Sequence, residues 1–150
     1  MESSNSEWLC VLGQSGSGKT HLCSAVANSF LNKGIEVRYC VWGIMMKELK
    51  QDAFSSAGTR ELMGKLQNVP VLYIDDLFKG IHTPQDDSLM FDLLNFRYNM
   101  NLITIITSEL LMDQLAEIDI AIAGRIRERC GEYLVQLRGN DKNYRFMANR

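Results

Sequence analysis

The eight residues GQSGSGKT, from Gly13 to Thr20, constrain the fold of this chain more than any other stretch. They follow a short apolar run at residues 7–12 and lead into residues 19–32, where apolar side chains recur at helical spacing. Glycine suits such a loop because its backbone enters regions of positive φ at little cost. The succession of strand, tight loop and helix predicts the first unit of an α/β fold.

The rest of the chain continues this alternation. Short apolar or β-branched runs predict further strands at residues 37–42, 71–74, 102–107 and 132–137. Helical spacing predicts helical segments at residues 43–66, with a break near 55–58, a helix at residues 84–100, and mostly helical structure at residues 109–130. This order predicts a three-layer α/β fold, in which helices cover both faces of a parallel sheet and the strand C-termini share one edge.

The composition fits one globular domain over residues 1–150. Apolar residues make up 46% of the chain and charged residues 23%, which excludes a disordered chain. The net charge of −2 predicts no general attraction to polyanions, and the four cysteines lack the spacing of a metal site. With no apolar run of ~18 residues and no signal peptide, the chain is predicted to be cytoplasmic and to have no membrane partner.

The glycine-rich loop also carries a binding motif. Gly13, Gly18, Lys19 and Thr20 match the pattern G-x-x-x-x-G-K-[ST], in which backbone N–H groups and a helix N-terminus hold phosphate oxygens. Lys19 is expected to reach the β- and γ-phosphates, and the Thr20 hydroxyl to ligate Mg²⁺. The sequence therefore predicts a site for ATP with Mg²⁺. Its nucleotide-binding residues are Gly13, Gln14, Ser15, Gly16, Ser17, Gly18, Lys19, Thr20 and His21.

Two acids follow the buried strand expected at residues 71–74. In VLYIDDL, the strand ends at Asp75 and Asp76, which places both carboxylates at the C-terminal edge of the sheet. Asp75 is predicted to hold Mg²⁺ together with Thr20, directly or through water. Asp76 is predicted to face the γ-phosphate and to orient or deprotonate the attacking water.

A pair of hydroxyl residues ends the next strand, in LITIITSEL. Thr107 or Ser108 is predicted to hydrogen-bond the γ-phosphate or the attacking water, and the residues alone leave open which of the two does so. The ordinary alternative is that Ser108 caps a helix that begins at Glu109, a favoured role for serine.

An arginine-rich segment, AIAGRIRERC, follows in the last predicted helix. Arg125, Arg127 and Arg129 alternate along it, so they cannot share one helix face. An arginine at the edge of a protein can complete the phosphate site of a neighbouring subunit and stabilise transition-state charge there. The alternative is that these arginines contact only solvent or a carboxylate.

Together, GQSGSGKTHL, VLYIDDLFKG, IITSEL and AGRIRERC resemble the AAA+ ATPase domain of the DnaC/DnaI helicase-loader family, including phage-encoded versions. The resemblance covers nearly the whole chain and implies a P-loop NTPase core without a C-terminal lid domain. It implies that Asp75 and Asp76 are Walker B, that Ser108 or Thr107 is sensor 1, and that Arg125 is the arginine finger. It further implies slow ATP hydrolysis, stimulated by DNA or by assembly into a homo-oligomer whose ATP sites lie between subunits. The implied partners are a replicative helicase of the DnaB type and single-stranded DNA.

One feature departs from that family. Few residues precede the first predicted strand, so the N-terminal domain that binds the helicase is expected to be missing. By this resemblance, residues 43–66 correspond to a helical insertion that is implicated in contact with single-stranded DNA in that family. The basic residues there are Lys47, Lys50, Arg60 and Lys65. Phosphate contacts from so few cations are expected to be weak and salt-dependent.

Three other functions remain open. An IstB-like transposition helper ATPase shares these motifs but binds duplex DNA, so strand preference separates it from a loader. A small-molecule P-loop kinase would need an arginine-rich lid and a substrate-binding acid, neither of which is evident, and the N-K-x-D motif of a GTPase is also missing. A module that holds ATP without turnover is the third, because Asp76 is shorter than the glutamate more usual at that position.

Overall fold

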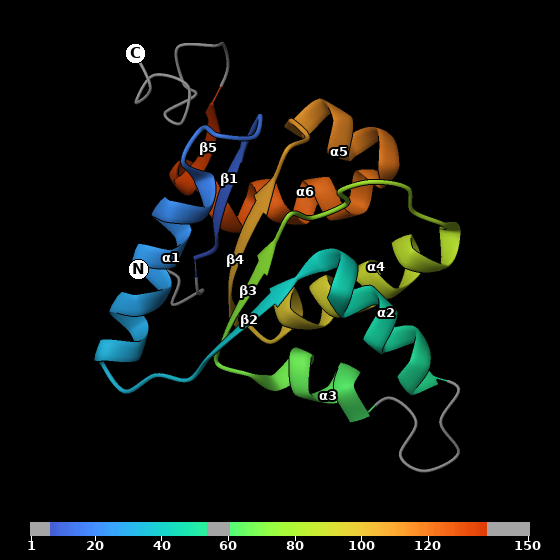
Figure 1. Ribbon diagram of the computed structural model, residues 1–150, viewed down its shortest axis with the longest axis horizontal. Coiled ribbons are helices and arrows are strands. Elements are labelled where there is room, and N and C mark those ends of the chain that lie inside the picture. Colours follow the sequence, from blue (N-terminus) through green and yellow to red (C-terminus); the bar gives the residue numbers. More distant parts are fainter. Residues whose placement is uncertain (1–6, 54–60, 138–150) are drawn as a thin grey trace.

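The computed structural model describes residues 7–53 and 61–137. Its centre is a five-stranded parallel sheet in the order β2-β3-β4-β1-β5 (Figure 1). The strands are β1 (Leu9–Gly13), β2 (Val37–Val41), β3 (Val71–Asp75), β4 (Ile103–Ser108) and β5 (Leu134–Leu137). The helices are α1 (Lys19–Asn32), α2 (Trp42–Ala53), α3 (Glu61–Asn68), α4 (Pro84–Asn99), α5 (Met112–Ile118) and α6 (Ile120–Cys130). The predicted α/β fold with a parallel sheet is confirmed.

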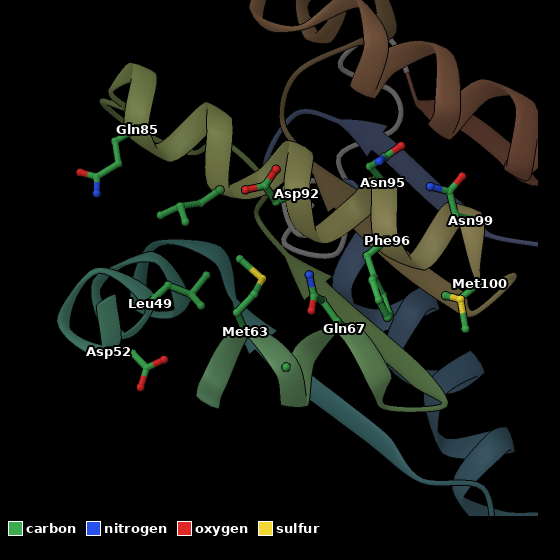
Figure 2. Close-up of a pocket in the computed structure, with 12 residues that line it drawn as sticks. Leu49, Asp52, Met63, Gln67, Gln85, Asp92, Asn95, Phe96, Asn99 and Met100 are labelled. Carbon is green, nitrogen blue, oxygen red and sulfur yellow. The ribbon is translucent and has the colours of Figure 1, made fainter. Parts of the chain in front are cut away.

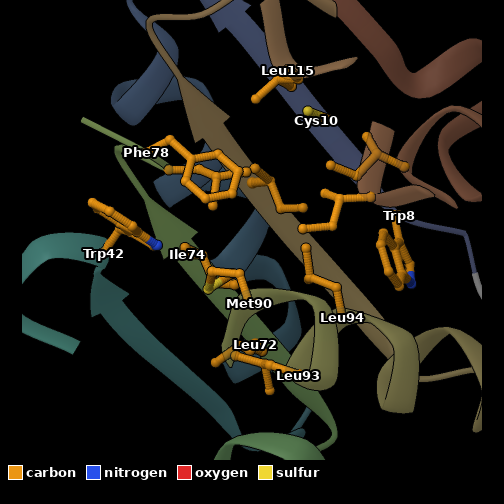
Figure 3. Packing of buried hydrophobic residues seen from close by; sticks show 14 of the residues in the cluster. Trp8, Cys10, Trp42, Leu72, Ile74, Phe78, Met90, Leu93, Leu94 and Leu115 are labelled. Atoms are coloured by element: carbon orange, nitrogen blue, oxygen red, sulfur yellow. The ribbon is translucent and has the colours of Figure 1, made fainter. Parts of the chain in front are cut away.

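Helices cover both faces of the sheet because strand side chains alternate between two apolar cores. On one face, α1 packs Cys23 and Ala27 against Val11, Tyr73 and Ile105. On the opposite face, the larger core joins the sheet to the other five helices. Figure 3 shows part of this core; it includes Trp8, Cys10, Leu72, Ile74, Met90, Leu93, Leu94 and Leu115.

The strand order brings the predicted site elements together. β4 lies between β3 and β1, with Ile106 opposite Ile74 and Thr107 opposite Val11. All five strands run in the same direction, so the loops that follow β1, β3 and β4 leave from one edge of the sheet. The sequence predicted this common edge but not the order of the strands.

Most predicted elements are found within a residue or two of their expected bounds, and α1 has the bounds expected for it. The prediction that residues 109–130 are mostly helical is confirmed, but the helical region starts later than Glu109 and is divided in two. It begins only at Met112, and Asp119 divides it because its side chain caps α6, accepting from the N–H groups of Ala121 (2.9 Å) and Ile122 (3.1 Å). The break expected near residues 55–58 lies outside the described residues.

A buried arginine stabilises the other edge of the sheet, where β3 and β4 begin. Arg97 in α4 is fully buried, and burial lowers the pKa of its guanidinium to about 10. Its N–H groups donate to the Thr104 hydroxyl (2.9 Å) and to the carbonyls of Leu66 (3.0 Å), Val69 (2.7 Å) and Ile103 (2.6 Å). These bonds connect the end of α3, the segment before β3 and the start of β4 to one side chain.

None of the described helices is long and apolar enough to span a bilayer.

Candidate functional site

The glycine-rich loop joins β1 to α1 with the backbone that its sequence predicted. Gly16 and Gly18 have φ of 83° and 90°, in the left-handed region that favours glycine. Gly13 has φ of 150°, and a Cβ there would lie 2.6 Å from the carbonyl oxygen of Leu137 in β5. Gly18, the N-cap of α1, has no side chain to cap the helix, and the first N–H groups of such a helix suit an anion held by the loop.

Two polar side chains in the loop are buried beside this helix start. Lys19 is 6% exposed, its ammonium donates to the carbonyl of Gln14 (3.0 Å), and burial lowers its pKa below the usual value. Ser17 is 1% exposed, and its hydroxyl oxygen has no hydrogen-bond partner among the described residues. Buried polar atoms are nearly always satisfied in proteins, so an unpartnered hydroxyl in this loop fits a site that is completed by an anion.

Four hydroxyl groups converge on the carboxylate of Asp75 at the end of β3. Its oxygens accept from Thr20 (3.2 Å), from Tyr39 (2.8 Å), from Tyr73 (3.4 Å) and from Thr107. Burial and the hydrogen bond to Asp75 raise the pKa of Tyr39 to about 12, so its hydroxyl remains a donor at neutral pH. These four donors hold the buried carboxylate in one orientation.

The predicted metal ligands lie together in the structure. The Thr20 hydroxyl and the Asp75 carboxylate are 3.2 Å apart, and both are the oxygen donors that Mg²⁺ prefers. Within residues 7–53 and 61–137, no group of three or more His, Cys, Asp and Glu side chains could hold a metal ion. Mg²⁺ bound with nucleotide needs no such group, because it takes one or two protein ligands plus phosphate and water oxygens. The donor set therefore fits Mg²⁺ bound together with phosphates.

The two hydroxyls at the end of β4 have different neighbours. Thr107 donates to Asp75 and accepts from the N–H of Asp76 (2.9 Å), whose backbone has φ of 61°. Ser108 donates to the carbonyl of Leu77 (2.8 Å) and accepts from the N–H of Leu110 (3.1 Å). Ser108 does not cap a helix that begins at Glu109, since α5 begins three residues later. Thr107 is thus the hydroxyl that contacts both predicted Walker B acids.

A cavity of about 990 Å³ opens beside the loop. Its lining includes these predicted residues: Ser15, Gly16, Ser17, Gly18, Lys19, Thr20, His21 and Asp76. It also includes five residues that the sequence interpretation did not single out: Leu22, Ala25, Lys79, Glu109 and Leu137. Lys79 and Glu109 follow β3 and β4, so the placement argument that found Asp76 could have found them as well.

Arg125 lies on α6 and is not among the residues that line this cavity. Its guanidinium donates to the side-chain oxygen of Asn95 (2.8 Å) and lies over the rings of Phe91 and Tyr98 at 5.1 and 5.4 Å from their centroids. It is half-buried against α4. Within one chain, therefore, the structure does not bring Arg125 to the other predicted catalytic residues.

A second cavity, of about 640 Å³, lies between α2, α3 and α4 (Figure 2). Its lining includes the carboxylates of Asp52 and Asp92 and five apolar side chains, those of Leu49, Met63, Leu89, Phe96 and Met100. None of the described residues that line this cavity is Lys or Arg, whereas Lys19 and Lys79 line the cavity beside the glycine-rich loop, so this second cavity suits phosphate less well.

The basic residues considered for DNA contact are partly neutralised. Lys50 forms a salt bridge with Asp86, and Lys65 pairs with Glu61 at 3.5 Å. Lys47 is exposed on α2. Arg60 lies outside the described residues.

Comparison with known proteins places the chain in a family. The profile of the family described as IstB-like ATP binding protein matches residues 3–145. YqaM of Bacillus subtilis (strain 168) is 35% identical over 138 residues, which cover 88% of this chain and 43% of YqaM. The replicative helicase loader DnaC of Escherichia coli (strain K12) is 37% identical over 73 residues, or 47% of this chain and 29% of DnaC. The chain spans less than half the length of either relative.

The fold comparison agrees with the sequence comparison. A crystal structure of DnaI is 26% identical and superposes with a TM-score of 0.78 over 90% of this chain and 75% of that chain. The resemblance to DnaC and DnaI is thus confirmed in both sequence and fold. With nearly the whole length matched by one family profile, the chain belongs to the family of IstB-like ATP binding proteins.

Proposed function

We propose that this chain is the ATP-hydrolysing domain of a DNA replication helicase loader. The observation that carries the proposal is one cavity lined by the glycine-rich loop, with its buried Ser17 hydroxyl, by Asp76, and by Thr20, whose hydroxyl donates to Asp75. Family membership supports ATP as the nucleotide. The match to the helicase loader DnaC supports the choice of replication over other uses of ATP.

Each residue near the phosphates has a separate part in this proposal. The N–H groups of the loop and the Lys19 ammonium bind the β- and γ-phosphates. Thr20 and Asp75 hold Mg²⁺, which neutralises phosphate charge when bound. Asp76 orients the water that attacks the γ-phosphate, and Thr107 holds the backbone of Asp76 by accepting the hydrogen bond from its N–H.

Arg125 is proposed to act in a neighbouring subunit. Its position on α6, outside the cavity of its own chain, suits a group that completes the site of an adjacent copy in a homo-oligomer. The guanidinium would leave Asn95 for the γ-phosphate and stabilise the charge that develops in the transition state. Hydrolysis would then depend on assembly, and ATP would control the oligomer on single-stranded DNA and its hold on a helicase of the DnaB type.

A second candidate is a transposition helper of the IstB type, because the matching family takes its description from IstB. Such a protein is expected to assemble on duplex DNA rather than on single strands. The preference of the assembled protein for one or the other distinguishes the two candidates, whereas ATP turnover alone does not.

The test is ATP turnover per chain, measured against protein concentration with no DNA, with single-stranded DNA and with duplex DNA of equal length. A loader should gain turnover with concentration and gain more from single strands. Greater stimulation by duplex supports the transposition helper. Turnover that is flat in concentration and indifferent to DNA contradicts both and indicates a self-contained site, as in a small-molecule kinase.

A further inference from the structure

Two side chains of opposite charge form a salt bridge in the lining of the cavity beside the glycine-rich loop. Lys79 follows β3 and Glu109 follows β4, and their side chains are 3.5 Å apart. Both line the cavity that the glycine-rich loop and Asp76 also line. The side chains are 54% and 35% exposed, so neither is fixed by burial. A pair this exposed is weak and can be exchanged for a stronger partner.

Both charges act on the phosphate-binding lysine. Burial is the main cause that lowers the pKa of Lys19, and Glu109 opposes this effect more than Asp76 or Asp75 does. Lys79 acts in the other direction and lowers that pKa further. Lys79 and Glu109 are therefore close enough to the Lys19 ammonium to interact with a phosphate that Lys19 binds.

The backbone that carries Lys79 is held firmly although its side chain is not. Three residues of this turn have positive φ: Asp76 at 61°, Phe78 at 59° and Gly80 at 88°. The N–H of Leu77 donates to the carbonyl of Thr107 (2.8 Å), which ties the turn to β4. Non-glycine residues in the left-handed region are strained, and strain of this kind gathers at functional turns. The anchored turn fixes the base of the Lys79 side chain, and its long flexible stem can reach in a different direction.

A triphosphate brings several negative charges into a cavity that already holds Glu109. A carboxylate next to phosphate is unfavourable, and a second ammonium is favourable, so an entering phosphate competes with Glu109 for Lys79. A diphosphate ends one phosphate earlier and competes less at the far end of the site.

We propose that Lys79 is a second phosphate-binding cation, which exchanges Glu109 for the terminal phosphate of ATP and thereby distinguishes ATP from ADP. The inference rests on the proposed function, because it assumes that this cavity is an ATP site. Lys79 would not take part in the bond cleavage itself. The Lys79 ammonium would add binding free energy that only a nucleotide with a γ-phosphate receives. The Lys79 side chain would also change position when ATP is replaced by ADP.

The test compares Lys79→Met with the control Lys33→Met. Lys33 is exposed at the far end of α1, about 20 Å from the loop at 1.5 Å per helical residue, so its substitution makes the same change in charge outside the cavity. The dissociation constants of a fluorescent non-hydrolysable ATP analogue and of fluorescent ADP are measured for each protein. We expect Lys79→Met to weaken the triphosphate analogue about tenfold, as for loss of one charge-assisted bond, and ADP by less than about threefold. Lys33→Met should change neither.

Glu109→Gln supplies the opposite arm. Removing the competing carboxylate charge should tighten the triphosphate analogue by a few-fold, with a smaller effect on ADP. Equal weakening of both nucleotides by Lys79→Met, or no change from it, overturns the inference. If the unsubstituted protein binds the analogue but does not hydrolyse ATP, the proposed function fails while the binding comparison still decides the role of Lys79.

Discussion

Thr107→Val removes one hydroxyl from the centre of the proposed catalytic site and keeps the shape of the side chain. That hydroxyl donates to Asp75 and accepts from the N–H of Asp76 at 2.9 Å. Thr107 is fully buried, so water cannot take the place of the lost group without rearrangement of the core. The substitution should therefore reduce both folding stability and the placement of Asp76.

The size of the loss follows from these two bonds. A hydrogen bond to a charged acceptor contributes about 1.5–3 kcal/mol, and an unpaired N–H costs about 1–3 kcal/mol when it is buried. Asp75 keeps three other hydroxyl donors and Asp76 is half-exposed, so the lower values apply. We expect the free energy of unfolding to fall by about 2–3 kcal/mol. Turnover should fall about 10- to 100-fold, because the group that orients water is displaced.

The matched control is Ser108→Ala, which removes the adjacent hydroxyl. Ser108 is equally buried, but it bonds the backbone at Leu77 and Leu110 rather than either acid. Loss of two neutral bonds should lower the free energy of unfolding by about 2 kcal/mol. Turnover should stay within about a factor of three, as for substitutions that alter stability alone.

Urea denaturation and steady-state ATP hydrolysis measure these effects, the latter at a temperature where both variants remain folded. The two variants should have similar stabilities and very different turnover. The reasoning is refuted if Ser108→Ala loses turnover while Thr107→Val keeps it, because the sensor would then be Ser108.

Three further outcomes are expected. Tyr39→Phe removes one donor that competes for Asp75, so the Mg²⁺ concentration at half-maximal binding of nucleotide should fall about two- to fivefold; an increase would mean that Tyr39 instead helps to hold the ion. Arg97→Met removes the hydrogen-bond donors of several buried carbonyls, so the free energy of unfolding, measured by urea denaturation, should fall by about 3–5 kcal/mol. Arg127→Met, at an exposed position on α6, is the control and should change the free energy of unfolding very little. Gly13→Ala should destabilise the chain by about 1–3 kcal/mol and weaken ATP binding, since the new Cβ would meet a β5 carbonyl oxygen at 2.6 Å; unchanged thermal unfolding would contradict that close approach.

The sequence predicted those features that depend on local pattern. The bounds of α1 and the positive φ of the loop glycines follow from helical spacing and from what only glycine tolerates. The start of α5 was mispredicted because the helix pattern does not reveal that Ser108 bonds Leu77 instead of capping.

The unpredicted part of the site depends on contacts between distant segments. Tyr39 donates to Asp75 because β2 pairs with β3 in a register that puts Tyr39 beside Tyr73, which lies two residues before Asp75 in β3, and composition gives no sign of that register. Lys79 and Glu109 meet because β4 neighbours β3, which depends on the order of strands in the sheet. The single-domain extent over residues 1–150 and the roles of the site residues stay predictions.

Hydrolysis of ATP at sites shared between subunits, as proposed above, can be tested by mixing two inactive variants. Lys19→Ala removes the ammonium that is proposed to bind phosphate but keeps Arg125, whereas Arg125→Ala keeps the glycine-rich loop and loses the proposed arginine finger. Each variant alone should be nearly inactive on single-stranded DNA, and Arg127→Ala on the same helix should retain turnover. Mixing the two inactive variants should restore turnover, because an intact loop then meets an intact Arg125 from its neighbour. If the mixture is no more active than the sum of its components, the site is complete within one chain and the account is wrong.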